Sequence, residues 1–159
     1  MNLFFNLFTR GEPTLSDAGA RDAAVIAALH AQSFHRGWSD EEVEGLLLDR
    51  HVIAHRATAG RKFAGFILSR LVQDEAEILS VAVARAQQGR GLARKLLDLH
   101  LRRLAGLGAR AVFLEVDEHN KPAIHLYDRA GFREVARRPN YYAMPSGRTA
   151  TALVLRRDL

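Results

Sequence analysis

The chain has 159 residues, of which 48% are hydrophobic and 26% are charged, and its formal net charge is +5. These values are typical of one globular domain with a single core and exclude a disordered or fibrous chain. The absence of cysteine excludes a disulfide framework, a thiolate nucleophile and a cysteine-bound metal. It also suits a reducing compartment, so we predict a cytoplasmic protein. The positive charge favours acidic partners, but the basic residues occur as isolated pairs, so we expect no direct nucleic-acid recognition.

The first residues form a separate segment. Residues 1–8 are apolar and aromatic, yet they are too short to span a membrane and lack the basic region and cleavage site of a signal peptide. Gly11 and Pro13 then interrupt the chain. We predict an apolar extension over residues 1–13, which packs on the domain, on a partner chain or on a membrane surface, and a single domain over residues 14–159. The sequence leaves open whether the protein is a monomer or a homodimer.

Periodicity predicts the elements of the first half of the domain. Ser39 followed by Glu42 is a capping box, which marks the start of a helix. Apolar residues at helical spacing mark an earlier helix, and three strand-like runs separated by polar turns form an antiparallel meander. The expected elements are a short strand at 14–17, helices at 22–34 and 40–48, and strands at 51–57, 63–72 and 75–84.

The second half alternates helices and strands. We expect helices at 91–107 and 120–130, a buried strand at 111–116, and strands near 132–136 and 149–155. Because a helix links the strand at 75–84 to that at 111–116, these two strands should be parallel. The predicted fold class is α/β, with a mixed sheet of about seven strands, an antiparallel meander followed by a central parallel βαβ unit, flanked by about four helices. Ligands should enter at the carboxyl ends of the parallel strands.

A glycine-rich turn joins that strand to the following helix, with the sequence Gln88-Gly89-Arg90-Gly91-Leu92-Ala93. Backbone N–H groups at a helix start lack internal partners, and glycines let phosphate oxygens approach them, so the turn can hold a diphosphate. It lacks the third glycine of the dinucleotide fingerprint and the Gly-Lys-Ser/Thr of the triphosphate loop. Taken alone, the turn is also compatible with a connection that binds nothing.

Three further residues carry polar groups toward the same region. Glu115 lies inside a buried strand, where a charge is costly unless it is solvated or paired. Asn120 opens the next helix, and Tyr127 follows seven positions later on nearly the same face. The helix therefore presents an amide and a phenol toward whatever the glycine turn holds.

This order of strand, turn, strand and Asn120…Tyr127 before Gly131-Phe132 resembles the GNAT acyl-CoA N-acyltransferases over about residues 14–155. A narrower group is more similar still: the ribosomal-protein alanine N-acetyltransferases (RimI type), which acetylate the N-terminal amine of a protein. The segments that carry this resemblance are 114–132, Arg138-Pro139-Asn140-Tyr141-Tyr142, Asp74-Glu75-Ala76 and Gly37-Trp38-Ser39.

The resemblance implies how acetyl-CoA would be bound as cosubstrate. The backbone N–H groups of Gln88 to Ala93 would hold its diphosphate, and Ala93 replaces a glycine common at that place. The Asn120 side chain would bond the pantetheine arm. A bulge and a divergence of strands would make room for that arm, which would pair like an extra strand with the backbone of Val81, Ala82 and Val83.

The resemblance also implies direct transfer, with Glu115 as the base and Tyr127 as the acid. Other roles remain open: Glu115 in a salt bridge, Tyr127 in the core and Asn120 as a helix cap. Trp38, Tyr141 and Tyr142 would line the acceptor site or simply pack. No histidines show metal-ligand spacing with carboxylate support, so we expect no metal.

The sequence thus predicts an acetyl-CoA-dependent N-acetyltransferase that acts on a protein N-terminus. The expected partner is a small-subunit ribosomal protein beginning with alanine. The alternative acceptors are a small-molecule amine, a lysine or a broader range of N-termini. The competing classes are a CoA-binding module without catalysis and a nucleic-acid binder. A nucleic-acid binder would show an affinity for RNA that falls steeply as the salt concentration rises.

Overall fold

A computed structural model of the chain describes residues 12–159, so the predicted apolar segment Leu3–Phe8 lies outside the described residues. Strands and helices occur where the sequence predicts them, with bounds that differ by a few residues at most places. The strands are β1 (Thr14–Asp17), β2 (Val52–Ala59), β3 (Lys62–Val72), β4 (Glu75–Val83), β5 (Ala111–Asp117), β6 (Arg133–Ala143) and β7 (Thr149–Asp158). The helices are α1 (Ala23–Ser33), α2 (Asp40–Leu48), α3 (Leu92–Gly106) and α4 (Lys121–Arg129), with short 3-10 turns η1 (Ala20–Asp22) and η2 (Arg85–Gln87). No helix in this part of the chain is long and apolar enough to cross a membrane.

The strands form one seven-stranded sheet in the order β1-β2-β3-β4-β5-β7-β6. The first four are antiparallel neighbours, and β4 and β5 are parallel, which confirms the predicted meander and βαβ unit. The position of β7 between β5 and β6 was not predicted, because strand order depends on contacts between distant segments.

Strand β6 extends well beyond the predicted end at residue 136 and includes Tyr141 and Tyr142, which lie between the strands predicted near 132–136 and 149–155. Its pairing with β7 continues past an irregularity between Arg138 and Tyr142, where Asn140 has a φ of 57°. Pro139 does not end the strand because it falls in this irregularity of an edge strand, where no residue pair with β7 is formed and its missing N–H breaks no ladder.

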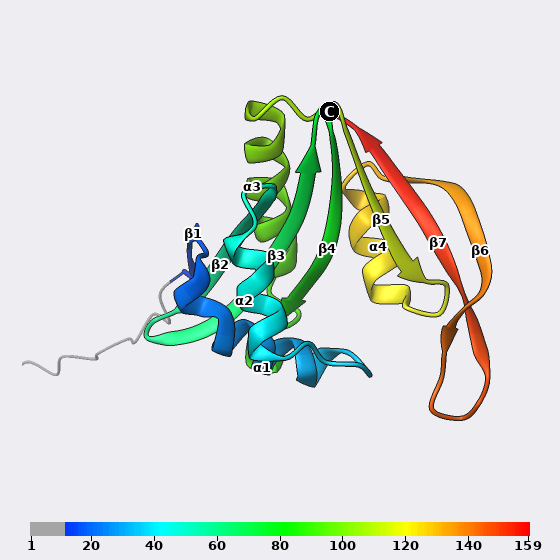
Figure 1. Cartoon of the computed structure of the whole chain (residues 1–159), viewed down its shortest axis with the longest axis horizontal. Helices are drawn as coiled ribbons and strands as arrows, with labels where there is room; N and C mark the ends of the chain where they lie inside the picture. The colour runs from blue at the N-terminus through cyan, green and yellow to red at the C-terminus, as the bar shows by residue number, and fades with distance from the viewer. Residues whose placement is uncertain (1–11) are drawn as a thin grey trace, which may run out of the picture.

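Two helical layers cover the sheet (Figure 1). Helices α3 and α4 lie on one face and pack on apolar residues of β4, β5 and β7, such as Ile78, Leu114 and Leu153. Helices α1 and α2 cover the other face only over β2, β3 and β4, around Phe66 and Leu68. The second face of β5 and β7 therefore stays uncovered by helices.

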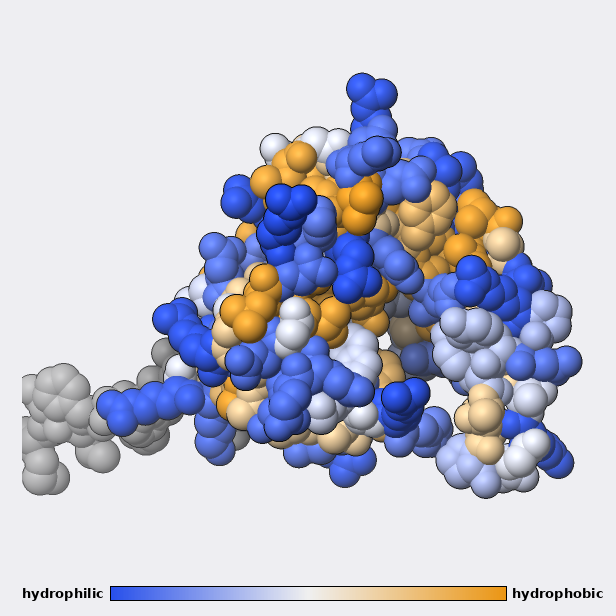
Figure 2. Space-filling model, in the orientation of Figure 1, coloured by the Kyte–Doolittle hydropathy of each residue, from blue (hydrophilic) through white to orange (hydrophobic). Residues whose placement is uncertain are grey.

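The sheet opens between its two parallel strands. β4 and β5 pair only from Glu75 opposite Ala111 to Glu77 opposite Phe113, whereas β5 pairs with β7 along its whole length. An extra residue, Leu79, bulges β4 where its register with β3 shifts, and bulges bend a strand. Beyond Glu77 the strands diverge, and Figure 2 shows the surface hollowed between the α1–α2 layer and the β6–β7 hairpin.

Candidate active site

The glycine turn presents a row of free backbone donors at the start of α3. Gly89 and Gly91 have φ values of 75° and 77°, in the left-handed region that glycine tolerates best. Gly91 is the N-cap of α3 and brings no capping side chain. From Gly89 to Ala93, no backbone N–H donates a hydrogen bond within the described chain. Together with the helix dipole, these donors fit an anionic diphosphate.

Gln88 ties the turn to the end of β4. Its side-chain Nε2 donates to the carbonyl of Val83 at 3.1 Å. The side chain therefore holds the turn close to the opening of the sheet and leaves the backbone of the turn free to bind a ligand.

The opened edge of β4 offers backbone groups from alternate residues. The N–H of Ala84 donates to the carbonyl of Ala64 in β3, so in an antiparallel ladder Ala82 also directs its backbone groups to β3. Val81 and Val83 direct theirs to the opening. Of the three residues predicted to pair with a pantetheine arm, these two have backbone groups on the correct side.

The predicted base and acid lie on opposite faces of the sheet. Leu114 and Val116 point into the core under α3 and α4, so Glu115 between them points to the other face. Tyr127 belongs to the core under α3 and α4. A single molecule can contact both side chains only where the sheet is open, and that place is the gap between β4 and β5.

Glu115 is partly buried and ion-paired. Its side chain is 23% exposed, and its Oε1 lies 2.9 Å from Nη1 of Arg138 on β6. The salt bridge considered from the sequence is therefore present. Burial, and then the negative charge of Glu115, raise the pKa of the Tyr142 phenol on the same strand as Arg138 to about 12.

Tyr127 is almost fully buried, with 5% of its surface exposed. Its ring meets that of Phe132 edge-on at 5.6 Å between centroids, and burial raises the pKa of its phenol above the usual value. Its hydroxyl makes no hydrogen bond to another residue of the described part. The side chain thus packs in the core and keeps its proton.

Asn120 caps α4, as predicted. Its Oδ1 accepts a hydrogen bond from the N–H of Ala123 at 3.2 Å. The cap uses the amide oxygen, so the amide NH2 of this exposed residue stays available to a ligand.

The aromatic residues predicted to line the acceptor site have different surroundings. Trp38 stacks on His30 with 4.0 Å between ring centroids, and its backbone N–H donates to Nδ1 of His30, so it has a packing role on α1. Tyr141 is 52% exposed and lies under the Arg138 guanidinium. Tyr141 and Tyr142 meet edge-on. The β6–β7 hairpin therefore brings Arg138 and both tyrosines to the Glu115 side of the sheet.

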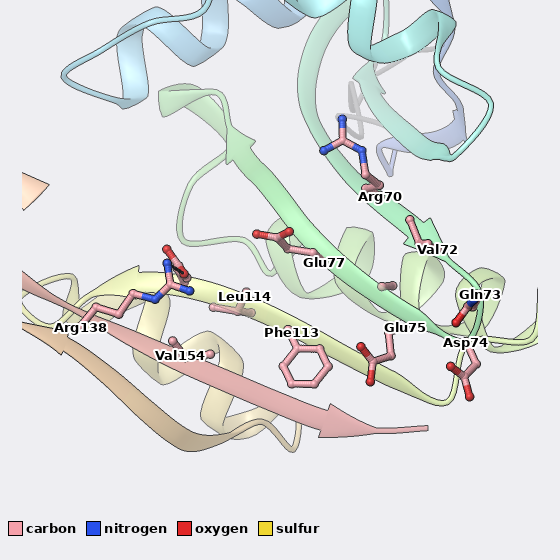
Figure 3. Close-up of a pocket in the computed structure, with 12 residues that line it drawn as sticks. Arg70, Val72, Gln73, Asp74, Glu75, Glu77, Phe113, Leu114, Arg138 and Val154 are labelled. Carbon is pink, nitrogen blue, oxygen red and sulfur yellow. Dashed lines mark ion pairs between the residues drawn. The ribbon is translucent and has the colours of Figure 1, made fainter. Parts of the chain in front are cut away.

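A groove of about 580 Å³ continues from Glu115 along β4 and β5, on the face opposite α3 and α4. In Figure 3, the Glu77 side chain extends toward the end of the groove that Arg138 closes. The sequence reading missed Glu77, although the alternation of Glu75, Ala76, Glu77 and Ile78 is a signal for a strand with one polar face. Across residues 12–159, no cluster of three or more metal-ligating side chains occurs.

The family of this chain follows from its similarity to known proteins. Residues 23–132 match the Acetyltransferase (GNAT) family. The chain belongs to the GNAT family. Membership confirms the predicted fold and the prediction of an N-acetyltransferase with acetyl-CoA as cosubstrate.

The relatives within the GNAT family include ribosomal-protein alanine N-acetyltransferases, the narrower group that the sequence resembles. The chain is 37% identical over 141 residues to the ribosomal protein bS18-alanine N-acetyltransferase of Haemophilus ducreyi, covering 82% of this chain and 97% of that protein. The crystal structure of the ribosomal-protein-S18-alanine N-acetyltransferase of Escherichia coli has a TM-score of 0.86 and 27% identity, covering 92% of this chain and 94% of the other. A third structure, Arabidopsis thaliana NAA60 in complex with acetyl-CoA, has a TM-score of 0.83 at 19% identity, covers 93% of this chain and 99% of that chain, and shows the shared fold.

Proposed function

We propose that the protein acetylates the N-terminal α-amine of a protein, and that its acceptor is a small-subunit ribosomal protein beginning with alanine. The observation that carries the proposal is the opened sheet, with Glu115 on one face and Tyr127 on the other. The names of the relatives in Haemophilus ducreyi and Escherichia coli support this choice of acceptor. The proposed setting is the cytoplasm.

The free N–H groups of Gly89 to Ala93 hold the diphosphate of acetyl-CoA, and the backbone of Val81 and Val83 pairs with its pantetheine arm. The Asn120 amide adds a further hydrogen bond to that arm. The bound cosubstrate supplies an acetyl thioester. These contacts direct it through the opening between β4 and β5.

Glu115 takes the proton that the acceptor amine loses as its nitrogen forms the new amide bond. An α-amine has an unperturbed pKa of about 7.7–8.0, so a carboxylate, acting directly or through water, is a sufficient base near neutral pH. The ion pair with Arg138 keeps the carboxylate in place and must loosen when the amine arrives. A backbone N–H of β4 that faces the opening stabilises the charge that develops on the carbonyl oxygen.

Tyr127 is the acid that assists departure of the CoA sulfur. A free thiol has a pKa of about 8.5 and a phenol about 10. Since burial raises the pKa of Tyr127 further, the phenol stays protonated. It donates a hydrogen bond to the thiolate as the carbon–sulfur bond breaks. It transfers the proton completely when the exclusion of water makes the thiolate more basic. No covalent acyl-enzyme is needed.

The test is an acetylation assay with purified protein and acetyl-CoA. Peptides that begin with alanine should gain one acetyl group at the α-amine, located by tandem mass spectrometry. The same peptides with a blocked N-terminus and an internal lysine should stay unmodified. Preference for a polyamine, an aminoglycoside or the lysine would overturn the proposed acceptor, and CoA binding without turnover on any amine would favour a non-catalytic module.

A further inference from the structure

The groove beside Glu115 starts where the sheet opens. Glu77 is the last residue of β4 that pairs with β5, opposite Phe113. Glu115 lies two positions beyond Phe113 on β5, and both carboxylates point to the face that α3 and α4 do not cover. Glu77 and Glu115 therefore flank the opening, one on each strand.

Glu77 has no partner for its charge among residues 12–159. The two arginines that line the groove are already paired, Arg138 with Glu115 at 2.9 Å and Arg70 with Asp49 at 3.6 Å. Glu77 is exposed and forms no ion pair in this part of the chain. Asp74 and Glu75 also line the groove without an ion pair in this part of the chain, so its lining carries four carboxylates against two arginines and attracts a cation locally, although the whole protein is positively charged.

Ser80 lies three positions further along the same strand and is not among the residues that line the groove. It is 7% exposed, and its Oγ has no hydrogen-bond partner in the described structure. Glu77 alternates with Ile78 and Ser80 with Val81, which both belong to the core under α3, so Glu77 and Ser80 face the same side. Bound water can satisfy this hydroxyl, and the charge in the groove comes from Glu77 and the other carboxylates that line it.

We infer that Glu77 is a specificity-determining residue that binds a cationic side chain, arginine or lysine, within the first residues of the acceptor chain. The inference rests on the proposed function, because the acceptor amine at Glu115 sets where the rest of the chain enters the groove. A carboxylate at this point forms a charge-assisted hydrogen bond with a guanidinium or ammonium group. A neutral side chain would leave Glu77 unpaired.

The experiment compares peptides that begin with alanine and carry either arginine or its uncharged analogue citrulline at one of positions two to five. The values of kcat and KM are measured for the natural protein, for Glu77→Gln, and for the control Asp128→Asn, which removes one negative charge from α4 on the covered face. The natural protein should favour the arginine peptide by about tenfold in kcat/KM at one position or more, mainly through KM, the factor expected for one charge-assisted hydrogen bond. Glu77→Gln should abolish this preference while keeping kcat on the citrulline peptide.

Two further variants make the result specific to charge. Glu77→Asp should retain part of the preference, and Glu77→Lys should reverse it toward a peptide with glutamate at the same position. Asp128→Asn should behave as the natural protein. An equal preference in Glu77→Gln and the natural protein, or none in the natural protein, would overturn the inference while leaving the proposed function intact. Acetylation of neither peptide by the natural protein would instead reject the proposed function and the inference together.

Discussion

At the scale of single residues, the Tyr127 side chain has a buried ring and a hydroxyl with no protein partner among the described residues. Its ring packs in the core against Phe132, while its hydroxyl has no hydrogen-bond partner in the described chain. Among residues 12–159, Ser80 Oγ is the only fully buried side-chain oxygen or nitrogen without a partner, so the Tyr127 hydroxyl at the end of the buried ring keeps some contact with solvent. A hydroxyl that is free of partners in this part of the protein and still reachable suits the hydrogen-bond donor role proposed for it at the leaving sulfur.

The change Tyr127→Phe should therefore separate catalysis from stability. We expect kcat to fall by about 10²-fold, the lower end of the range for a general acid. The free energy of unfolding should change by less than about 1 kcal/mol, since the hydroxyl makes no bond within the described protein. Steady-state kinetics and urea unfolding give the two quantities. The dissociation constant of CoA, measured by calorimetry, should stay the same, and an unchanged kcat would remove Tyr127 from the mechanism.

At the scale of elements, the start of α3 depends on a backbone conformation that other residues adopt poorly. Gly91 caps the helix with a φ of 77°, and an added Cβ would meet no atom within 4 Å. A substitution there is strained by conformation and not by crowding.

Gly91→Ala should lower the free energy of unfolding by about 1 kcal/mol and weaken CoA binding several-fold, because the strained cap misplaces the N–H groups of the turn. Gly45→Ala is the matched control. Gly45 lies inside α2, and its added Cβ also meets nothing within 4 Å. This change should stabilise the protein by about 0.5–1 kcal/mol and leave CoA binding unchanged. Equal effects of the two changes on unfolding and CoA binding would contradict the assignment of the turn.

At the scale of the whole molecule, a buried chain of polar side chains joins three strands and α3. Nδ1 of His55 on β2 lies 2.7 Å from Nδ1 of His100 on α3, and Nε2 of His100 lies 2.6 Å from Oγ of Ser69 on β3. At the exposed end of this chain of side chains, Oδ1 of Asp17 on β1 lies 3.4 Å from Nε2 of His55. Burial, and then the neighbouring His55, lower the pKa of His100 to about 3, and burial also lowers the pKa of His55.

This chain should make folding stability depend on pH. A histidine with a lowered pKa in the folded state is neutral there while the unfolded chain takes up a proton below about pH 6.5, so stability is present above that pH and declines as the pH falls toward 3. His100 alone should account for roughly 1–2 kcal/mol between pH 6.5 and pH 5. Urea unfolding across this range measures the slope.

The variant His100→Gln identifies the source of that pH dependence. It keeps a polar side chain opposite Ser69 but removes the titrating ring, so the loss of stability on acidification should shrink. His125→Gln, at an exposed position on α4, should leave the slope unchanged. An identical slope in His100→Gln and the natural protein would show that the buried pair does not control acid stability.

Local patterns in the sequence were sufficient for most elements and for the glycine turn. Capping signals, alternation and apolar periodicity act over a few residues, and these interactions fix where α2, β4 and α3 begin and end. The same local information failed for β6, since Pro139 signals an end unless the strand is known to lie at an edge.

The same distinction between local patterns and long-range contacts holds for the candidate active site. Residue types and spacing identified Glu115, Asn120, Tyr127 and the turn as candidates, because a strand, a turn and a helix impose their geometry locally. Pairing between distant segments was needed to show that the sheet opens after Glu77, that Glu115 and Tyr127 face opposite sides, and that Arg138 closes on Glu115. Such contacts depend on strand order and register, which the free energy of the packed fold selects and which no short window of sequence contains.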